Sequence, residues 1–139
     1  MKKLFAMLLA LVMALTLVAC GEQDGNDPQG GATGDKVIKI GVFEPQSGDN
    51  GAGGKQEILG MQYANKMFPT VTVGGEEYQV ELVYADNASS NDKAPTAAQT
   101  LISQGVSVVL GSYGSGVSIA AGDTFSAAQV PAIGVACTN

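Results

Sequence analysis

The sequence contains no histidine and only two cysteines, Cys20 and Cys137. Without histidine, the chain cannot build a zinc site of the usual His/Cys type, nor a Ser–His or Cys–His nucleophile. One thiol beyond Cys20 cannot form an internal disulfide. We therefore expect no metal and no cofactor, and we interpret Cys137 as a small residue in or near the core.

Positive charge is also scarce. The chain has 7 basic residues, all of them lysine, against 13 acidic residues, and its net charge at pH 7 is −6. The lysines are scattered and form no stripe, so nucleic acid is not an expected partner. We interpret the acidity as an aid to solubility.

The longest apolar run lies at the N-terminus and is short for a membrane span. Lys2 and Lys3 precede residues 4–19, which only Thr16 interrupts; a spanning helix needs about 20 apolar residues. A basic start and an apolar middle are typical of a secretory signal. Because the run ends in LVAC, which resembles a bacterial lipobox, we expect a lipoprotein signal peptide over 1–19 and lipidation of Cys20. An ordinary signal peptide with an incidental cysteine is the alternative.

Residues 20–35 have the composition of a tether. After Cys20 the segment reads GEQDGNDPQGGATGD and contains no large apolar residue. Such a segment cannot bury enough surface to offset the entropy lost on ordering. We expect a flexible linker that holds a folded domain, residues 36–139, close to the membrane.

Strand-like and helix-like patterns alternate over residues 36–139. Apolar or alternating runs predict strands at 37–43, 76–86, 106–110 and 131–136. The first helical pattern ends at Pro69, the second is capped by Asn91 or Asp92 and stopped by Gly105, and the third lies between the last two strands. The apolar stripe expected on the first helix comprises Ile58, Leu59, Met61, Tyr63, Ala64 and Phe68. This order predicts an α/β fold, a doubly wound parallel sheet with helices on both faces.

The strand compositions predict the order 2-1-3-4. The second strand alternates and is the most polar, which favours an edge, whereas the third is almost wholly apolar, which favours the centre. This order places a topological switch point between strands one and three, and ligands bind beyond the carboxyl ends of the strands there. The loops at that point, 44–54 and 111–117, are the most glycine-rich of the folded part.

A glycine-rich loop that opens a helix can hold an anion. Phosphate is disfavoured because Asp49 replaces the first glycine of the Walker pattern and Gln56 replaces its Ser or Thr. The G-x-G-x-x-G spacing of the Rossmann pattern is absent as well. A carboxylate remains, with tight turns that bind nothing as the alternative.

Three segments carry a family resemblance: IKIGVFEPQSGDNGAGGKQEILGMQYAN, VELVYADNASSNDKAPTAAQTLISQGVSVVLGSYGSGVSIAAGD and VPAIGVACTN. Together they resemble the leucine/isoleucine/valine-binding family, the extracytoplasmic solute receptors of ABC transporters, which have the type I periplasmic-binding-protein fold. The resemblance implies the first lobe of a two-lobe protein. It also implies that this lobe is incomplete, so that the chain is an N-terminal fragment.

The resemblance implies a set of ligand-binding residues. Ser115 would bind the α-carboxylate of an amino acid, and the Ala136 carbonyl and Thr138 would bind its ammonium and carboxylate. Ser47 lies in the SG motif of the first loop. Gly114 and Gly116 would let backbone N–H groups approach the anion. Some members carry an aromatic residue in the first loop, where this chain has residues 52–54, Ala-Gly-Gly.

The expected function is therefore capture of an amino acid, of the branched-chain type or a similar small polar solute, for uptake through ABC permease subunits. The expected location is outside the cytoplasm, on a lipid anchor. A ligand-sensing domain of a membrane signalling receptor is the alternative. An exported enzyme is disfavoured because histidine is absent and the acids Glu44 and Asp123 are isolated, so we interpret both as solvated or capping residues.

Overall fold

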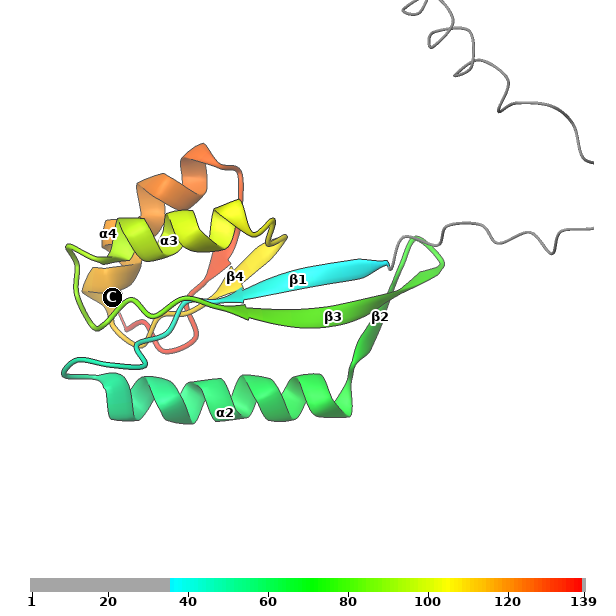
Figure 1. Cartoon of the computed structure of the whole chain (residues 1–139), viewed down its shortest axis with the longest axis horizontal. Helices are drawn as coiled ribbons and strands as arrows, with labels where there is room; N and C mark the ends of the chain where they lie inside the picture. The colour runs from blue at the N-terminus through cyan, green and yellow to red at the C-terminus, as the bar shows by residue number, and fades with distance from the viewer. Residues whose placement is uncertain (1–35, 139) are drawn as a thin grey trace, which may run out of the picture. The chain divides into compact units, whose positions relative to one another are not determined.

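The computed structural model describes residues 36–138, which form an α/β fold (Figure 1). The predicted signal peptide, Cys20 and the predicted linker lie outside the described residues. In chain order the elements are β1 (Val37–Val42), α2 (Gly51–Met67), β2 (Thr70–Val73), β3 (Glu76–Tyr84), α3 (Ala94–Ser103), β4 (Val108–Leu110), α4 (Ser115–Ala127) and β5 (Ala132–Ile133). Within 36–138, no helix has both the length and the apolar character that crossing a membrane requires.

The sheet has the order β2-β3-β1-β4-β5. β1 pairs in parallel with β3 on one side and with β4 on the other, and β5 continues in parallel beyond β4. The predicted order of the four strands is confirmed. The switch point therefore lies between β1 and β4, as expected.

The edge position predicted for β3 is wrong, because β2 pairs with β3 in an antiparallel hairpin. The connection is Gly74–Gly75, with φ of +61° and +85°. Positive φ at both central residues is the requirement of a two-residue hairpin turn that matches strand twist. The Gly-Gly pair in TVTVGGEEYQV is thus the sequence signal of this hairpin.

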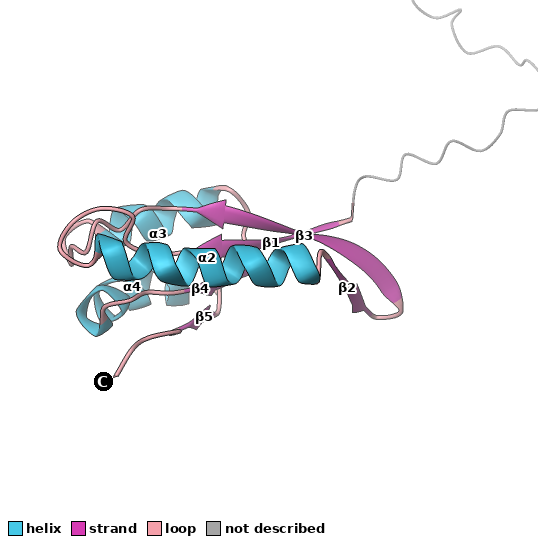
Figure 2. Ribbon diagram, turned by 90° about the horizontal axis from the view of Figure 1, so that it is seen from below, coloured by secondary structure: helices cyan, strands magenta, loops and turns pink. Residues whose placement is uncertain are grey.

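The main core lies between the sheet and the helices α3 and α4, which cover one face, whereas α2 lies along the other (Figures 1 and 2). The rings of Phe43 and Phe125 meet edge to face there, with centroids 5.4 Å apart. The alanines on the inner face of α3 are buried in this core. The buried cluster consists of Phe43, Val83, Ala85, Ala94, Ala97, Ala98, Leu101, Val106, Val109, Val117, Ala121 and Phe125.

The α2 face is packed more loosely. Ile58 is buried as predicted, but Leu59 and Tyr63 are 57% and 66% exposed. The predicted stripe is therefore wrong at those two positions, which turn away from the sheet, and Ala64 and Phe68 are exposed as well, Phe68 to 74%. Between the C-terminal half of α2 and the strands runs an apolar groove of about 460 Å³, lined by Ile40, Gly60, Met61, Ala64, Asn65, Phe68, Thr70, Val71, Val80, Leu82 and Leu110.

Two helix starts differ from prediction. α2 begins at Gly51, inside the segment predicted as loop 44–54, since its first turn carries little side-chain bulk and packs closely against the strand-end loop. Lys93 rather than Asn91 or Asp92 is the N-cap of α3, and no side chain caps that helix. Gly105, at φ +74°, follows the end of α3 as predicted.

Candidate functional site

The loops that follow β1 and β3 are joined by one carboxylate. Asp86 accepts hydrogen bonds from the Ser47 hydroxyl (2.6 Å), from the backbone N–H groups of Gln46 and Ala88 (2.8 Å each), and from the Ser47 N–H (3.3 Å). The Ser89 hydroxyl adds a bond to the Ser47 carbonyl oxygen (3.1 Å). The predicted site residue Ser47 is therefore held by Asp86, and its hydroxyl is already a donor in the structure.

These bonds act on the charge of Asp86. Partial burial opposes ionisation, but the hydrogen bonds from Ser47, Gln46 and Ala88 together outweigh it and hold the pKa of Asp86 below its ordinary value of 3.8. Next to it, Asn87 is fully buried, donates to the Phe43 carbonyl (3.0 Å) and accepts the Ser89 N–H (3.0 Å). The β3 loop is thus fixed to the end of β1 by an ionised and a neutral side chain.

The loop after β4 is fixed from two directions. Ser112 is buried; its hydroxyl donates to the Gly114 carbonyl (2.9 Å), and its N–H donates to the Ser118 hydroxyl (3.1 Å). The Ser118 oxygen also lies 3.0 Å from the sulfur of Cys137. Cys137 is half-buried, in agreement with its interpretation as a near-core residue, and it joins the segment after β5 to α4.

The structure brings together two of the predicted ligand residues. Ser115 is the first residue of α4, as predicted, and its hydroxyl oxygen accepts the backbone N–H of Thr138 at 3.1 Å. Ala136 is half-buried in the same C-terminal segment. No hydrogen bond joins Ser47 to either Ser115 or Thr138 in the described part of the chain.

The start of α4 has the properties of an anion site. Gly114 is its N-cap, no side chain caps it, and no acidic residue occupies its first turn. The first N–H groups of a helix lack intrahelical acceptors and carry partial positive charge. At Gly116 a Cβ would lie 3.2 Å from the Asn91 amide oxygen, a tight contact, whereas at Gly114 the nearest atom would be an ordinary 3.7 Å away.

Two residues beside this site were not singled out from the sequence as ligand residues. Tyr113 is 41% exposed, and its ring lies where a Cβ on Gly53 would be, 2.5 Å from the nearest ring carbon. The glycine-rich start of α2 therefore makes room for an aromatic ring from the β4 loop. In the sequence, the one indication of this aromatic residue at the site is the tyrosine within the loop GSYGS.

Glu44 is the other residue, and its interpretation as a solvated or capping acid is wrong. Its side chain is fully buried, and one carboxylate oxygen accepts the Tyr113 N–H at 2.8 Å. The pKa of Glu44 is raised from 4.5 to about 8; burial is the largest cause, the charge of Glu57 and a hydrogen bond with its carboxyl group add to the rise, and the bond from the Tyr113 N–H opposes it. Asp123 is exposed on α4, as expected. The only sequence signal for Glu44 was its place directly after an apolar strand.

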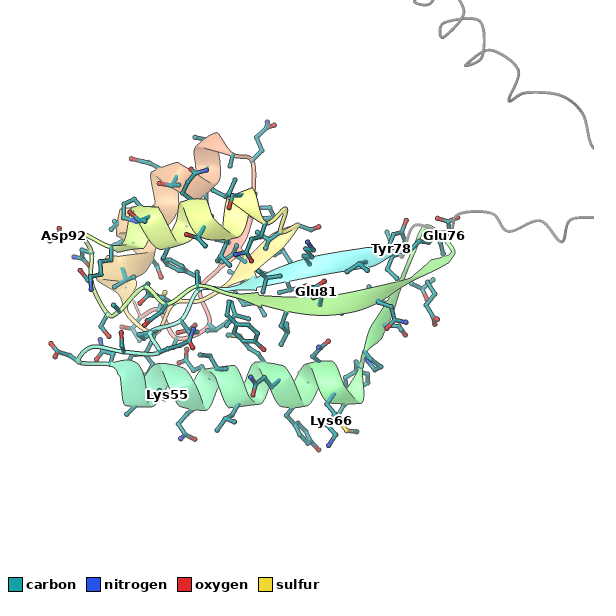
Figure 3. The ribbon with its side chains drawn as sticks, viewed as in Figure 1. Lys55, Lys66, Glu76, Tyr78, Glu81 and Asp92 are labelled. Carbon is teal, nitrogen blue, oxygen red and sulfur yellow. The ribbon has the colours of Figure 1, made fainter. Side chains whose placement is uncertain are left out.

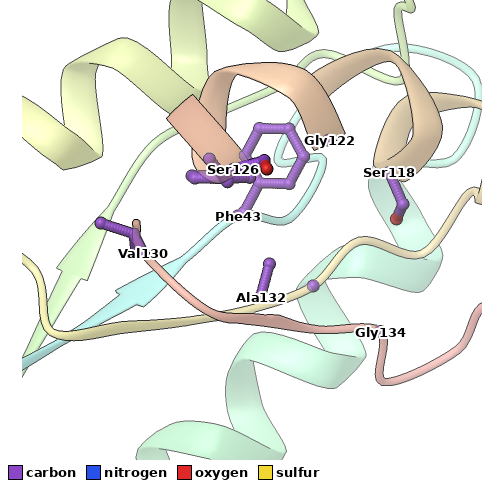
Figure 4. Close-up of a pocket in the computed structure, with 9 residues that line it drawn as sticks. Phe43, Ser118, Gly122, Ser126, Val130, Ala132 and Gly134 are labelled. Atoms are coloured by element: carbon purple, nitrogen blue, oxygen red, sulfur yellow. The ribbon is translucent and has the colours of Figure 1, made fainter. Parts of the chain in front are cut away.

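A separate cavity of about 310 Å³ lies between α4 and β5 (Figure 4). It is lined by Phe43, Gly111, Ser118, Gly122, Phe125, Ser126, Val130, Ala132 and Gly134. None of the predicted ligand residues is among them. The candidate site is therefore the open surface at the start of α4, and not this cavity.

The described lysines do not gather near the site. Lys55 and Lys66 lie at opposite ends of α2, and Glu76 and Tyr78 lie at the far end of β3 (Figure 3). Lys36 pairs with Glu76 at 2.8 Å, at the opposite end of the sheet from the strand-end loops. Residues 36–138 also bring no three His, Cys, Asp or Glu side chains together in a way that could hold a metal ion.

The chain is similar to known binding proteins. The model of the periplasmic binding protein family matches residues 37–139. The Leu/Ile/Val-binding protein homolog 2 of Brucella abortus is 32% identical over 110 residues, which are 78% of this chain and 29% of that protein. The chain thus spans less than a third of the length of this relative.

Solved structures of solute-binding proteins are also similar to this chain. The branched-chain amino acid transporter substrate binding protein LivJ from Streptococcus pneumoniae, in complex with isoleucine, has a TM-score of 0.65 and 32% identity over 75% of this chain and 30% of its own. A solute binding protein of an ABC transporter from Rhodopseudomonas palustris was solved in complex with 3,4-dihydroxy benzoic acid. It has a TM-score of 0.64 and 29% identity, and the match covers 73% of this chain and 28% of that protein. These relatives are solute-binding proteins and not enzymes, as the sequence led us to expect.

Proposed function

The chain belongs to the periplasmic binding protein family, and on that premise we propose that it is part of a receptor that binds a small carboxylate solute and delivers it to an ABC permease. The family implies a location outside the cytoplasm. The preferred ligand class is an amino acid of the branched-chain type or of similar size.

The observation that carries this proposal is the position of Ser115. Its hydroxyl lies at the uncapped N-terminus of α4 and is bonded to the Thr138 N–H, so that hydroxyl and backbone donors converge on one spot. A carboxylate placed there would accept charge-assisted hydrogen bonds and would be favoured by the helix dipole. The Ala136 carbonyl, in the same segment as Thr138, would accept a hydrogen bond from the ammonium group of the ligand.

Tyr113 would provide the apolar wall of the site. Its exposed ring packs over Gly53. Aromatic surface from the β4 loop would thus take the place of the first-loop aromatic residue that the family resemblance implies for some members. The S. pneumoniae relative was solved with isoleucine and the R. palustris relative with an aromatic acid. Both ligands combine a carboxylate with a hydrocarbon chain or ring, which is the combination that Ser115 and Tyr113 would recognise.

A lipid anchor fits this function. We propose that lipidated Cys20 and a linker over 20–35 hold the binding domain near the permease. A tethered receptor meets its membrane partner at a high effective concentration.

The test is calorimetric titration of the full-length protein, wild type and Ser115→Ala, with amino acids and their carboxamides. Loss of one hydrogen bond to a charged group costs about 1.5–3 kcal/mol, so binding of the amino acid should weaken roughly ten- to a hundredfold. Ser126→Ala, an exposed serine at the other end of α4, is the matched control. Binding that tolerates amidation of the carboxylate, or that ignores the Ser115 change, would refute the assignment.

A further inference from the structure

We propose that Glu44 and Glu57 form a carboxyl pair that shares one proton, and that this pair positions the Tyr113–Ser115 loop for the ligand. The link to ligand binding rests on the function proposed above, whereas the shared proton does not. Glu44 follows β1, Glu57 lies in the second turn of α2, and Tyr113 follows β4, so the pair joins three segments that are distant in sequence.

The first observation is a set of unsatisfied oxygens. Glu44 is fully buried, and while one oxygen accepts the Tyr113 N–H at 2.8 Å, the other (Oε1) has no hydrogen-bond donor among the described residues. Glu57 is half-buried, and its Oε2 is likewise enclosed without a donor from the described part of the chain. Buried acceptors without donors are costly and rare in native proteins.

A single proton removes both defects. If Glu44 takes up a proton from solvent, its O–H group donates to Glu57, and one hydrogen bond then satisfies a buried oxygen on each side. Two nearby carboxylates in a site of low polarity cannot both ionise, whereas a carboxyl–carboxylate pair holds one charge and one strong bond. The interaction of the two groups and the raised pKa of Glu44, about 8, agree with this state.

Among residues 36–138, no positive charge compensates that of Glu44. α2 presents Glu57, the β4 loop presents the neutral Tyr113 N–H, and the β3 loop presents the neutral amide of Asn87, which bonds to the Phe43 carbonyl. Lys55, on the same helix as Glu57, is exposed, and Asp86 is exposed and bonded to the first loop. At Gly111 there is no side chain, and a Cβ there would lie 2.9 Å from Glu44 Oε1.

The pair acts on the site through Tyr113. The carboxyl of Glu44 holds the N–H of Tyr113, two residues before Ser115, and Glu57 holds Glu44 against α2. When the shared proton leaves, two negative charges repel across the contact between α2 and this loop. The donors at the start of α4 then lose their fixed position, so ligand affinity should fall as pH rises through about 8.

The experiment is a pH titration of the full-length protein with carbon-13 in the glutamate carboxyl groups, followed by NMR without ligand. One carboxyl should titrate near pH 8, and its signal should disappear in Glu44→Gln. In Glu57→Gln, which removes a charge and introduces an amide N–H donor to the Glu44 carboxylate, it should titrate at lower pH. Glu81→Gln, at an exposed glutamate of β3, is the control and should leave that signal in place. A Glu44 carboxyl signal that titrates near pH 4.5 would overturn the shared proton. So would a signal that shifts on addition of sodium or calcium ions but not with pH.

Calorimetry with the amino acid that binds tightest supplies the second arm. If only the protonated pair is competent, affinity should fall about tenfold between pH 7 and pH 9. Glu44→Gln, whose amide bonds to the same two partners without titrating, should flatten this profile. If the affinity of the wild type does not change with pH although the Glu44 carboxyl titrates near pH 8, the positioning role is overturned. Absence of binding with that titration present would overturn the proposed function and leave the pair standing.

Discussion

Replacement of Asp86 by alanine should loosen the two loops that approach the site from β1 and β3. The carboxylate accepts four hydrogen bonds, three of them from backbone N–H groups at 2.8–3.3 Å and one from the Ser47 hydroxyl at 2.6 Å. Asp86 is exposed, so water replaces part of each bond, and we take about 0.5 kcal/mol for each rather than the value of a buried charged bond. The free energy of unfolding should fall by about 2 kcal/mol, or roughly 8–16 °C in Tm.

The assay is urea unfolding of the full-length protein followed by circular dichroism. Asp123→Ala, at an exposed aspartate of α4, is the matched control and should change stability by no more than about 0.5 kcal/mol. Because the pKa of folded Asp86 lies below the ordinary 3.8, its stabilisation is present above that pH and is lost as pH falls through the lowered value. The gap between wild type and Asp86→Ala should therefore be constant from pH 5 to 8 and close in stronger acid. A gap no larger than that of the control would refute the role of Asp86.

Three further predictions concern other parts of the chain. Cys20→Ala should abolish labelling of the cellular protein by radioactive fatty acid; unchanged labelling would contradict the lipoprotein assignment. Gly54→Ala should lower the free energy of unfolding by about 1–3 kcal/mol, since its Cβ would lie 2.2 Å from the Pro45 carbonyl oxygen. Gly60→Ala, whose Cβ would have no atom within 4 Å, should instead raise it by about 0.5–1 kcal/mol; urea unfolding measures both. Tyr113→Ala should weaken binding of apolar amino acids about tenfold in calorimetry and leave the unfolding midpoint nearly unchanged, and an equal loss for glycine would argue against an apolar wall.

The sequence predicts the layout of the sheet because strand polarity reports burial. The apolar run at 106–110 and the alternating run at 76–86 place the strands correctly relative to β1. The prediction failed at β2 and on one side of α2, where contacts between distant segments and not the local pattern decide which residues are buried. TVTV is too short and too exposed to show a strand pattern, and Leu59 and Tyr63 follow a helical period although α2 turns them away from the sheet.

The candidate site was only partly accessible from sequence. The small-residue loop at the start of α4 has a local signature, and Ser115 lies at the predicted helix start. Glu44 and Glu57 have no such signature, because each is an ordinary acid until folding brings the end of β1 and α2 together around them. Tyr113 over Gly53 is likewise a contact between segments about sixty residues apart, which no local pattern reports.

The parallel pairing of β1 has a kinetic consequence. Its residues pair with a strand that follows much later, Val37 with Gln79, and with one later still, Ile40 with Val108. Among the described strands, only β2 and β3 pair as near neighbours in sequence. The folding nucleus must therefore close long loops before most of the apolar strand surface is covered. Such a topology folds slowly, and its central strand stays available to non-native partners for longer than the strands of a helical bundle or a meander would. A protein that must pass through a membrane unfolded would benefit from that delay.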